Sequence, residues 1–273
     1  MRRGAAIDAS RMQSWVDRFR FYRASPNQTE IQAWIDRFKP VDRDLAARIL
    51  DCVEVISEPT IQQGYSQALE SLPGWHRLKS QRDGRWFFTG FGGPSESGMS
   101  MLRIFREANK LTAKAYDDLF CTVLEIPEKK LTAEDTIVIV DDFAGTGKQI
   151  TDRWPTLYEL IASDAKAYLI LTAATEAAIA RISSETTLEP MVSFPIQRNE
   201  NVFAPICRRF NDEERNKLLL YCRQADNQHP RGYGDCGLLY ILSHKTPNNS
   251  IPILHSNHGR WKGLFPRNLQ QDA

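Results

Sequence analysis

Apolar residues in the first sixty positions recur every three or four residues, the spacing of one face of an α-helix. Ser25-Pro26-Asn27 and Pro40 break the pattern into three segments. Together these predict helices through residues 10–57, with the apolar faces as core. The residues on these faces are Trp15, Phe19 and Tyr22; Ile31, Trp34, Ile35 and Phe38; and Leu45, Ile49, Val53 and Ile56.

From residue 85 the pattern changes to short apolar runs, each followed by a loop and an amphipathic helix. The runs are RWFFTGFG from Arg85, IVIV from Ile137, AYLILTAA from Ala167 and a further segment, LEPMVSFPI, from Leu188. Alternating strands and helices predict an α/β fold with a mostly parallel sheet. In such sheets ligands bind beyond the carboxyl ends of strands, and residues 141–147 follow one such end.

The last third of the chain predicts one helix and a hairpin-like pair of strands. The helix covers FNDEERNKLLLYCRQ, with Asn211 or Asp212 as its N-cap and acidic residues in its first turn. The strands are joined at the turn residues 246–249. The whole pattern predicts two domains, an N-terminal helical region at 1–80 and an α/β domain at 81–273.

Composition narrows the function classes. The chain has 273 residues, 42% hydrophobic and 25% charged, with a net charge of +1. This balance argues against strong intrinsic nucleic-acid binding, although a local basic patch remains open. No apolar run is long enough to span a bilayer, and the start of the chain lacks the apolar region of a secretory signal. We expect no membrane partner.

The five cysteines are scattered, and none forms a C-x-x-C pair. An odd, unpatterned set indicates buried thiols in a reducing compartment, not a disulfide framework or a zinc site. We therefore expect a cytoplasmic protein.

A glycine-rich turn follows the run from Ile137, and it fits neither common nucleotide-binding pattern. A Walker loop needs glycine at position 142 and Ser or Thr at 149, where the chain has Asp142 and Gln149. A dinucleotide-binding fingerprint needs glycine at position 150, where the chain has Ile150. The chemistry must therefore be inferred from the residues themselves.

The turn combines donors for an anion with acceptors for hydroxyl groups. Amides of Gly145 to Gln149, at the start of a helix, can bind a phosphate, and Thr146 adds a hydroxyl. Ionised Asp141 and Asp142 can only accept hydrogen bonds, for example from sugar hydroxyls. A ribose 5-phosphate carries both groups, and Mg²⁺ near the diol would offset repulsion from further phosphates. The alternative is an ordinary strand-ending turn, with Lys148 on an exposed helix face.

The segment around this turn resembles the phosphoribosyl-pyrophosphate motif of type I phosphoribosyltransferases. It consists of four apolar residues, then Asp141-Asp142, then three variable residues and finally Thr146-Gly147. The resemblance implies that Asp141 and Asp142 bind the ribose hydroxyls and act in catalysis, and that they hold Mg²⁺ indirectly, through ribose or water. The implied phosphate-binding positions are Ala144, Gly145, Thr146, Gly147, Lys148 and Gln149. The family's pyrophosphate loop would lie at residues 92–98 and end in Ser97 and Gly98, which could also be only a helix start.

Four further segments resemble one group within this superfamily. They are similar to segments of the phosphoribosyltransferase-like effector domain (PRTase-CE) of bacterial conflict systems, and the resemblance covers roughly residues 30–267. The segments are FAGTGKQ, GPSESG before MLRIFREAN, TPNNSIPIL and WKGLFPR. That resemblance implies a sheet of the type I phosphoribosyltransferase type and a role in anti-phage defence, in some cases retron-associated. A reverse transcriptase or another defence-system protein would then be a partner.

Two positions depart from the purine-type pattern. Gly145 replaces a third acid, and Gln149 replaces a Thr or Ser. Ordinary purine salvage is therefore not expected, although ribose-phosphate binding is. The implied reaction is displacement of pyrophosphate at the anomeric carbon, through an oxocarbenium-like transition state. The acceptor stays open: a nucleobase, water, a nucleotide or a macromolecular side chain. The alternatives are a catalytically silent ribose-phosphate sensor or structural subunit, and a nucleic-acid-binding role beside a reverse transcriptase.

Several residues near the C-terminus are expected to have structural roles and not catalytic or metal-binding ones. His255 and His258 could form a metal pair, but they lack accompanying ligands at matching spacing and indicate a surface loop. His244 follows a predicted strand and is expected to be structural. The WKGLFPR segment predicts an aromatic plug, with Arg267 able to pair inward with a carboxylate or phosphate.

Overall fold

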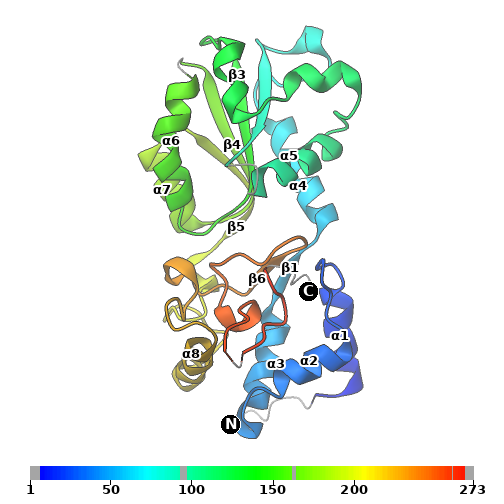
Figure 1. Ribbon diagram of the computed structural model, residues 1–273, viewed down its shortest axis with the longest axis vertical. Helices are drawn as coiled ribbons and strands as arrows, with labels where there is room; N and C mark the ends of the chain where they lie inside the picture. The colour runs from blue at the N-terminus through cyan, green and yellow to red at the C-terminus, as the bar shows by residue number, and fades with distance from the viewer. Residues whose placement is uncertain (1–6, 93–96, 162–163, 260, 268–273) are drawn as a thin grey trace. The chain divides into compact units, whose positions relative to one another are not determined.

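A computed structural model of the chain describes residues 7–92, 97–161, 164–259 and 261–267. The chain divides into two compact units (Figure 1). One is the single stretch Pro59–Ile196, here called the continuous unit. The other combines Met1–Glu58 with Gln197–Ala273, and is here called the terminal unit.

The continuous unit is built on a four-stranded, fully parallel sheet in the order β2-β3-β4-β5. This confirms the predicted α/β class. Parallel neighbours require crossover connections, which helices supply. Helices α4 and α5 cover one face and α6 and α7 cover the other (Figure 1). The bounds are β2 Trp86–Gly90, β3 Thr136–Ala144, β4 Lys166–Thr175, β5 Glu189–Ile196, α4 Glu58–Ser71, α5 Ser97–Ala108, α6 Lys148–Ile161 and α7 Glu176–Glu185.

Strands β2, β3 and β4 are buried on both faces, as their uninterrupted apolar runs require, whereas most of the edge strand β5 is only partly buried. On one face, Ile137 and Ile139 of β3 pack with Trp154 and Leu157 of α6. On the other, Phe88 of β2 lies against Phe105 of α5, with ring centroids 5.1 Å apart. Short 3₁₀ helices complete the unit: η2 Lys79–Gln81, η3 Lys114–Leu119, η4 Val123–Glu125 and η5 Pro127–Lys129.

The terminal unit joins the two ends of the chain. Its two-stranded parallel sheet pairs β1 with β6, and its helices share one core. Phe265 is fully buried between the rings of Phe19 and Tyr22, and Trp261 packs against Trp34. The predicted aromatic plug is confirmed. The bounds are α1 Ala9–Phe19, α2 Gln28–Ile35, η1 Pro40–Asp42, α3 Arg43–Cys52, β1 Glu54–Ile56, η6 Arg198–Glu200, α8 Asp212–Ala225, η7 Tyr233–Asp235, β6 Tyr240–Leu242 and η8 Pro252–Leu254.

The two units do not coincide with the division into 1–80 and 81–273 that the sequence predicts. Helix α4, inside the first of those ranges, packs on the sheet of the continuous unit through Tyr65, whose hydroxyl donates to the main-chain oxygen of Asp141 in β3 at 2.9 Å. The C-terminal segment instead packs with the N-terminal helices.

Three element predictions are wrong. The helix expected to reach Ile56 ends at Cys52, because Glu54–Ile56 pairs with β6. The second strand expected after residues 246–249 is a 3₁₀ helix, which starts at Pro252, a residue that cannot donate to a ladder. Strand β3 was expected to stop before Asp141, yet it continues to Ala144.

All five cysteines are free thiols. Within the described ranges, no helix combines the length and the apolar character needed to cross a membrane.

Candidate functional site

The two aspartates lie at the carboxyl end of β3 and are both buried, with 5% and 8% of their surfaces exposed. Neighbouring residues of a strand normally point to opposite faces. Here both carboxylates nevertheless lie within hydrogen-bond distance of one hydroxyl: Ser97 Oγ lies 2.9 Å from Asp141 Oδ1 and 3.0 Å from Asp142 Oδ1. The amide of Asp142 also donates to Asp141 Oδ1 at 2.9 Å, which holds that carboxylate beside its neighbour.

The paired carboxylates disfavour double ionisation. Burial raises the pKa of Asp141 well above its usual value, and the negative charge of Asp142 raises it further. The hydrogen bonds from the Asp142 amide and from Ser97 act in the opposite direction. Such a pair is stabilised by added hydroxyl donors or by a nearby cation, since both favour the ionised form.

Tyr65 fixes the backbone beneath this pair. Its hydroxyl donates to the main-chain oxygen of Asp141 at 2.9 Å and accepts from Thr172 Oγ1 at 3.0 Å. Burial raises the pKa of Tyr65 well above its usual value, so its hydroxyl remains a donor. We regard Tyr65 as a positioning residue. The sequence does not single it out, because a lone tyrosine on a helix has no signal that separates it from an ordinary core residue.

The glycine turn connects β3 to α6 within three residues, Gly145, Thr146 and Gly147. Gly147 has φ +71°, and a Cβ there would lie 3.0 Å from the main-chain oxygen of Ala178, so this position requires glycine. Thr175 Oγ1 donates to the Gly145 oxygen at 2.7 Å and ties the turn to the end of β4. The amides of Ile150 and Thr151 in the first turn of α6 donate to the Gly147 oxygen, and the helix dipole favours an anion at this end.

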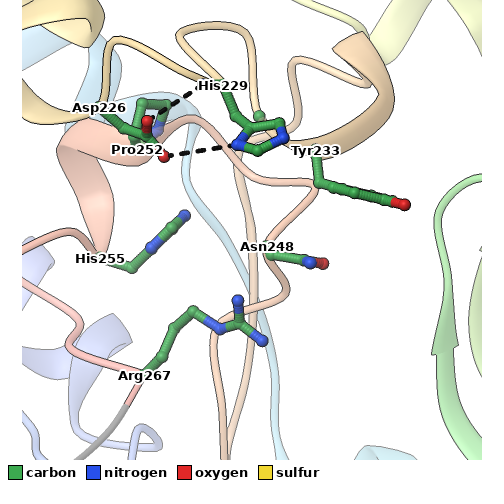
Figure 2. A pocket seen from close by; sticks show the side chains of 8 residues that line it. Asp226, His229, Tyr233, Asn248, Pro252, His255 and Arg267 are labelled. Atoms are coloured by element: carbon green, nitrogen blue, oxygen red, sulfur yellow. Dashed lines mark hydrogen bonds and ion pairs between the residues drawn. The ribbon is translucent and has the colours of Figure 1, made fainter.

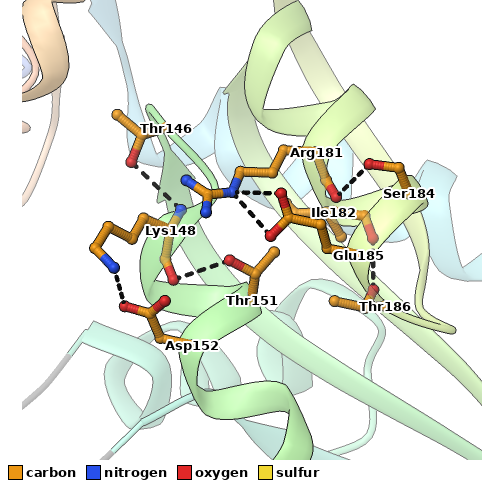
Figure 3. Close-up of polar contacts among 9 residues, drawn as sticks. All are labelled: Thr146, Lys148, Thr151, Asp152, Arg181, Ile182, Ser184, Glu185 and Thr186. Atoms are coloured by element: carbon orange, nitrogen blue, oxygen red, sulfur yellow. Dashed lines mark hydrogen bonds and ion pairs between the residues drawn. The ribbon is translucent and has the colours of Figure 1, made fainter.

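The side chain of Lys148 does not turn toward the loop. Its Nζ pairs with Asp152 at 2.6 Å, along the surface of α6, and the side chain is 53% exposed (Figure 3). The backbone amide of Lys148 donates to Thr146 Oγ1 at 3.3 Å. Gln149 is likewise exposed. Main-chain groups and Thr146, not the lysine ammonium, are the donors that this turn offers.

The start of α5 lies very close to the end of β2. A Cβ on Gly98 would lie 2.0 Å from the Phe91 oxygen, and one on Gly90 would lie 2.5 Å from the Gly98 carbonyl carbon. This glycine contact brings Ser97 to the carboxylates. Ser97, Gly98, Asp141 and Asp142 are thus brought together, and the stretch from Ala144 to Gln149 continues from the same strand end. Residues 93–96 of the expected pyrophosphate loop lie outside the described residues.

The terminal unit has a separate small pocket of about 170 Å³ (Figure 2). His255 and Arg267 line it, and His255 Nε2 lies 3.2 Å from the Ser250 oxygen. Burial, followed by the charge of Arg267, lowers the pKa of His255 to about 4, so this ring is neutral at pH 7. The other residues that line the pocket are Asp226, His229, Gly232, Tyr233, Asn248 and Pro252.

His258 is exposed and does not line that pocket. Within the described part of the chain, no three His, Cys, Asp or Glu side chains are grouped to hold a metal ion by themselves.

Comparison with known protein families shows which family the chain belongs to. The profile of the PRTase-CE family matches residues 31–267, most of both units. The chain belongs to the PRTase-CE family. This confirms the predicted resemblance and identifies a phosphoribosyltransferase-like domain. A comparison with curated proteins gives no match.

Proposed function

We propose that the chain binds a ribose 5-phosphate group, as found in phosphoribosyl pyrophosphate. The sugar diol would donate to Asp141 and Asp142, and the phosphate would accept from the amides of the turn 145–149. The observation that carries this proposal is that both carboxylates lie within hydrogen-bond distance of a single aliphatic hydroxyl, that of Ser97. They therefore already bind the kind of group that a ribose would present.

The carboxylates also fit Mg²⁺, because carboxylate oxygens are the ligands this ion prefers. Asp141 and Asp142 would hold it indirectly, through ribose or water. When bound, Mg²⁺ would offset the charge of a pyrophosphate group. The chain's own residues orient the sugar: Tyr65 fixes the main chain at Asp141, and the glycine turn fixes the phosphate.

We assign to this site the displacement of pyrophosphate at the anomeric carbon. The bond from that carbon to the pyrophosphate oxygen breaks, the acceptor's lone pair forms the new bond, and pyrophosphate leaves with the bonding electrons. Positive charge develops on the sugar ring in the transition state, and an ionised carboxylate of the pair would stabilise it. Family membership also supports a role in anti-phage defence, with a reverse transcriptase or another defence-system protein as partner.

A second candidate function is ribose-phosphate binding without turnover, as a sensor or a subunit of a defence complex. Gly145 favours it, because this position offers no third carboxylate to assist an acceptor. Pyrophosphate release during prolonged incubation separates the two functions, since only the catalytic one produces it.

Calorimetric titration with phosphoribosyl pyrophosphate and Mg²⁺ tests the shared binding step. Asp141→Asn and Asp142→Asn should each weaken binding by about 10- to 100-fold, the value of a hydrogen bond to a charged group. Asp152→Asn is the matched control, because this exposed acid pairs only along α6, and it should bind as the parent does. Equal affinity of all four proteins would refute the proposal.

A further inference from the structure

Ser97 occupies the two carboxylate oxygens that the proposed ligand needs. Its hydroxyl lies 2.9 Å from Asp141 Oδ1 and 3.0 Å from Asp142 Oδ1. Resting on the proposed function, we infer that Ser97 is an internal competitor for the ribose diol, so that the ligand enters by displacing the Ser97 hydroxyl and not by bonding to it.

A vicinal diol should outcompete the Ser97 hydroxyl, because the diol has two protons to donate and the serine has one. A serine hydroxyl carries one proton, so it can donate to only one of the two carboxylates at a time. A vicinal diol carries two and can donate to both. Exchange of Ser97 for a diol therefore adds a hydrogen bond to a buried, charged pair, whereas exchange for a single hydroxyl adds none. The Ser97 contact thus makes the site selective for vicinal diols.

The first turn of α5 itself cannot move closer to the sheet. Gly90 and Gly98 already approach so closely that a Cβ on either would overlap the other segment's backbone. Ser97 is only partly buried, so its side chain has room to turn about the Cα–Cβ bond. Displacement accordingly requires a rotamer change of one side chain, while the helix start keeps its place.

Titration of ribose 5-phosphate and 2-deoxyribose 5-phosphate into four full-length proteins tests this inference. Ser97→Ala should lower the Kd for ribose 5-phosphate about 3- to 10-fold, because one competing hydrogen bond is removed. Ser97→Thr keeps the hydroxyl and should restore the parent value. Ser100→Ala is the matched control, an exposed serine on the same helix, and should also bind as the parent does. In the parent, the deoxy sugar should bind at least about 10-fold more weakly.

The two other outcomes for Ser97→Ala overturn the inference. Weaker binding would make Ser97 a direct ligand contact, and unchanged binding would make its hydroxyl irrelevant, yet both leave the proposed function intact. Absence of binding by all four proteins, with unchanged circular dichroism, would instead refute the proposed function and the inference with it. Equal affinity for the two sugars would overturn the selectivity.

Discussion

The continuous and terminal units differ in where the partners of their buried groups lie along the chain. In the continuous unit, strands that pair are consecutive in the sequence, β2 to β5, and the aspartates, turn and helix start follow one another within a few residues. In the terminal unit, Trp34 Nε1 donates to the Ile253 oxygen across 219 residues, at 2.9 Å. Local sequence therefore determines the strand end, the glycine turn and the helix start, although Ser97 and Tyr65 reach Asp141 from 44 and 76 residues away. The terminal unit depends instead on the two chain ends meeting.

The largest effect expected from this difference is that of Trp34→Ala. It removes a buried indole and its hydrogen bond to Ile253, which should lower the free energy of unfolding by about 3–5 kcal/mol. Trp154→Ala, a buried tryptophan of the continuous unit, is the size-matched control. Hydrogen exchange should show faster exchange of α1–α3 and α8 for Trp34→Ala, with β3 and β4 still protected.

Trp154→Ala should give the opposite exchange pattern. If Trp34→Ala instead accelerated exchange equally in β3 and in α2, the two units would unfold as one, and the comparison between them would fail.

The same difference determines which features could be predicted from sequence. The pattern IVIV, Asp141-Asp142 and the glycine turn predicts a strand and a helix correctly, because both signals are local. The ligand site that the same pattern predicts stays a prediction. Strand β1 was mistaken for helix because its partner β6 lies far along the chain. Tyr65 was missed for a similar reason, since its partner, the Asp141 oxygen, is 76 residues away and is a main-chain atom with no sequence signature.

A smaller effect is the pH dependence of folding stability, which should have opposite signs for one group in each unit. His255 has its pKa lowered to about 4, so below about pH 6.5 the unfolded chain binds a proton that the folded chain does not, and stability falls between these values. Asp141 has its pKa raised, mainly by burial, so stability is full below its usual pKa and is lost as the pH rises through the higher folded value.

Urea denaturation at pH 5 and pH 8 distinguishes these two contributions. His255→Gln keeps a side-chain donor for the Ser250 oxygen and should recover about 2 kcal/mol at pH 5, with little change at pH 8. Asp141→Asn should stabilise the chain more at pH 8 than at pH 5. If each variant followed the pH dependence of the parent, neither group would titrate differently on folding.

The smallest effect should come from Lys148, although it lies beside the most informative turn of the continuous unit. Lys148→Met removes an exposed ion pair with Asp152, which is worth about 0.3–0.5 kcal/mol, and leaves the main-chain amides of the turn in place. Thermal stability should change by less than about 1 °C to 2 °C. Affinity for ribose 5-phosphate should stay within about twofold, since one hydrogen bond to a charged group would be worth more than that. A loss of tenfold or more would place the ammonium on the phosphate, and the turn's backbone would no longer be sufficient for binding.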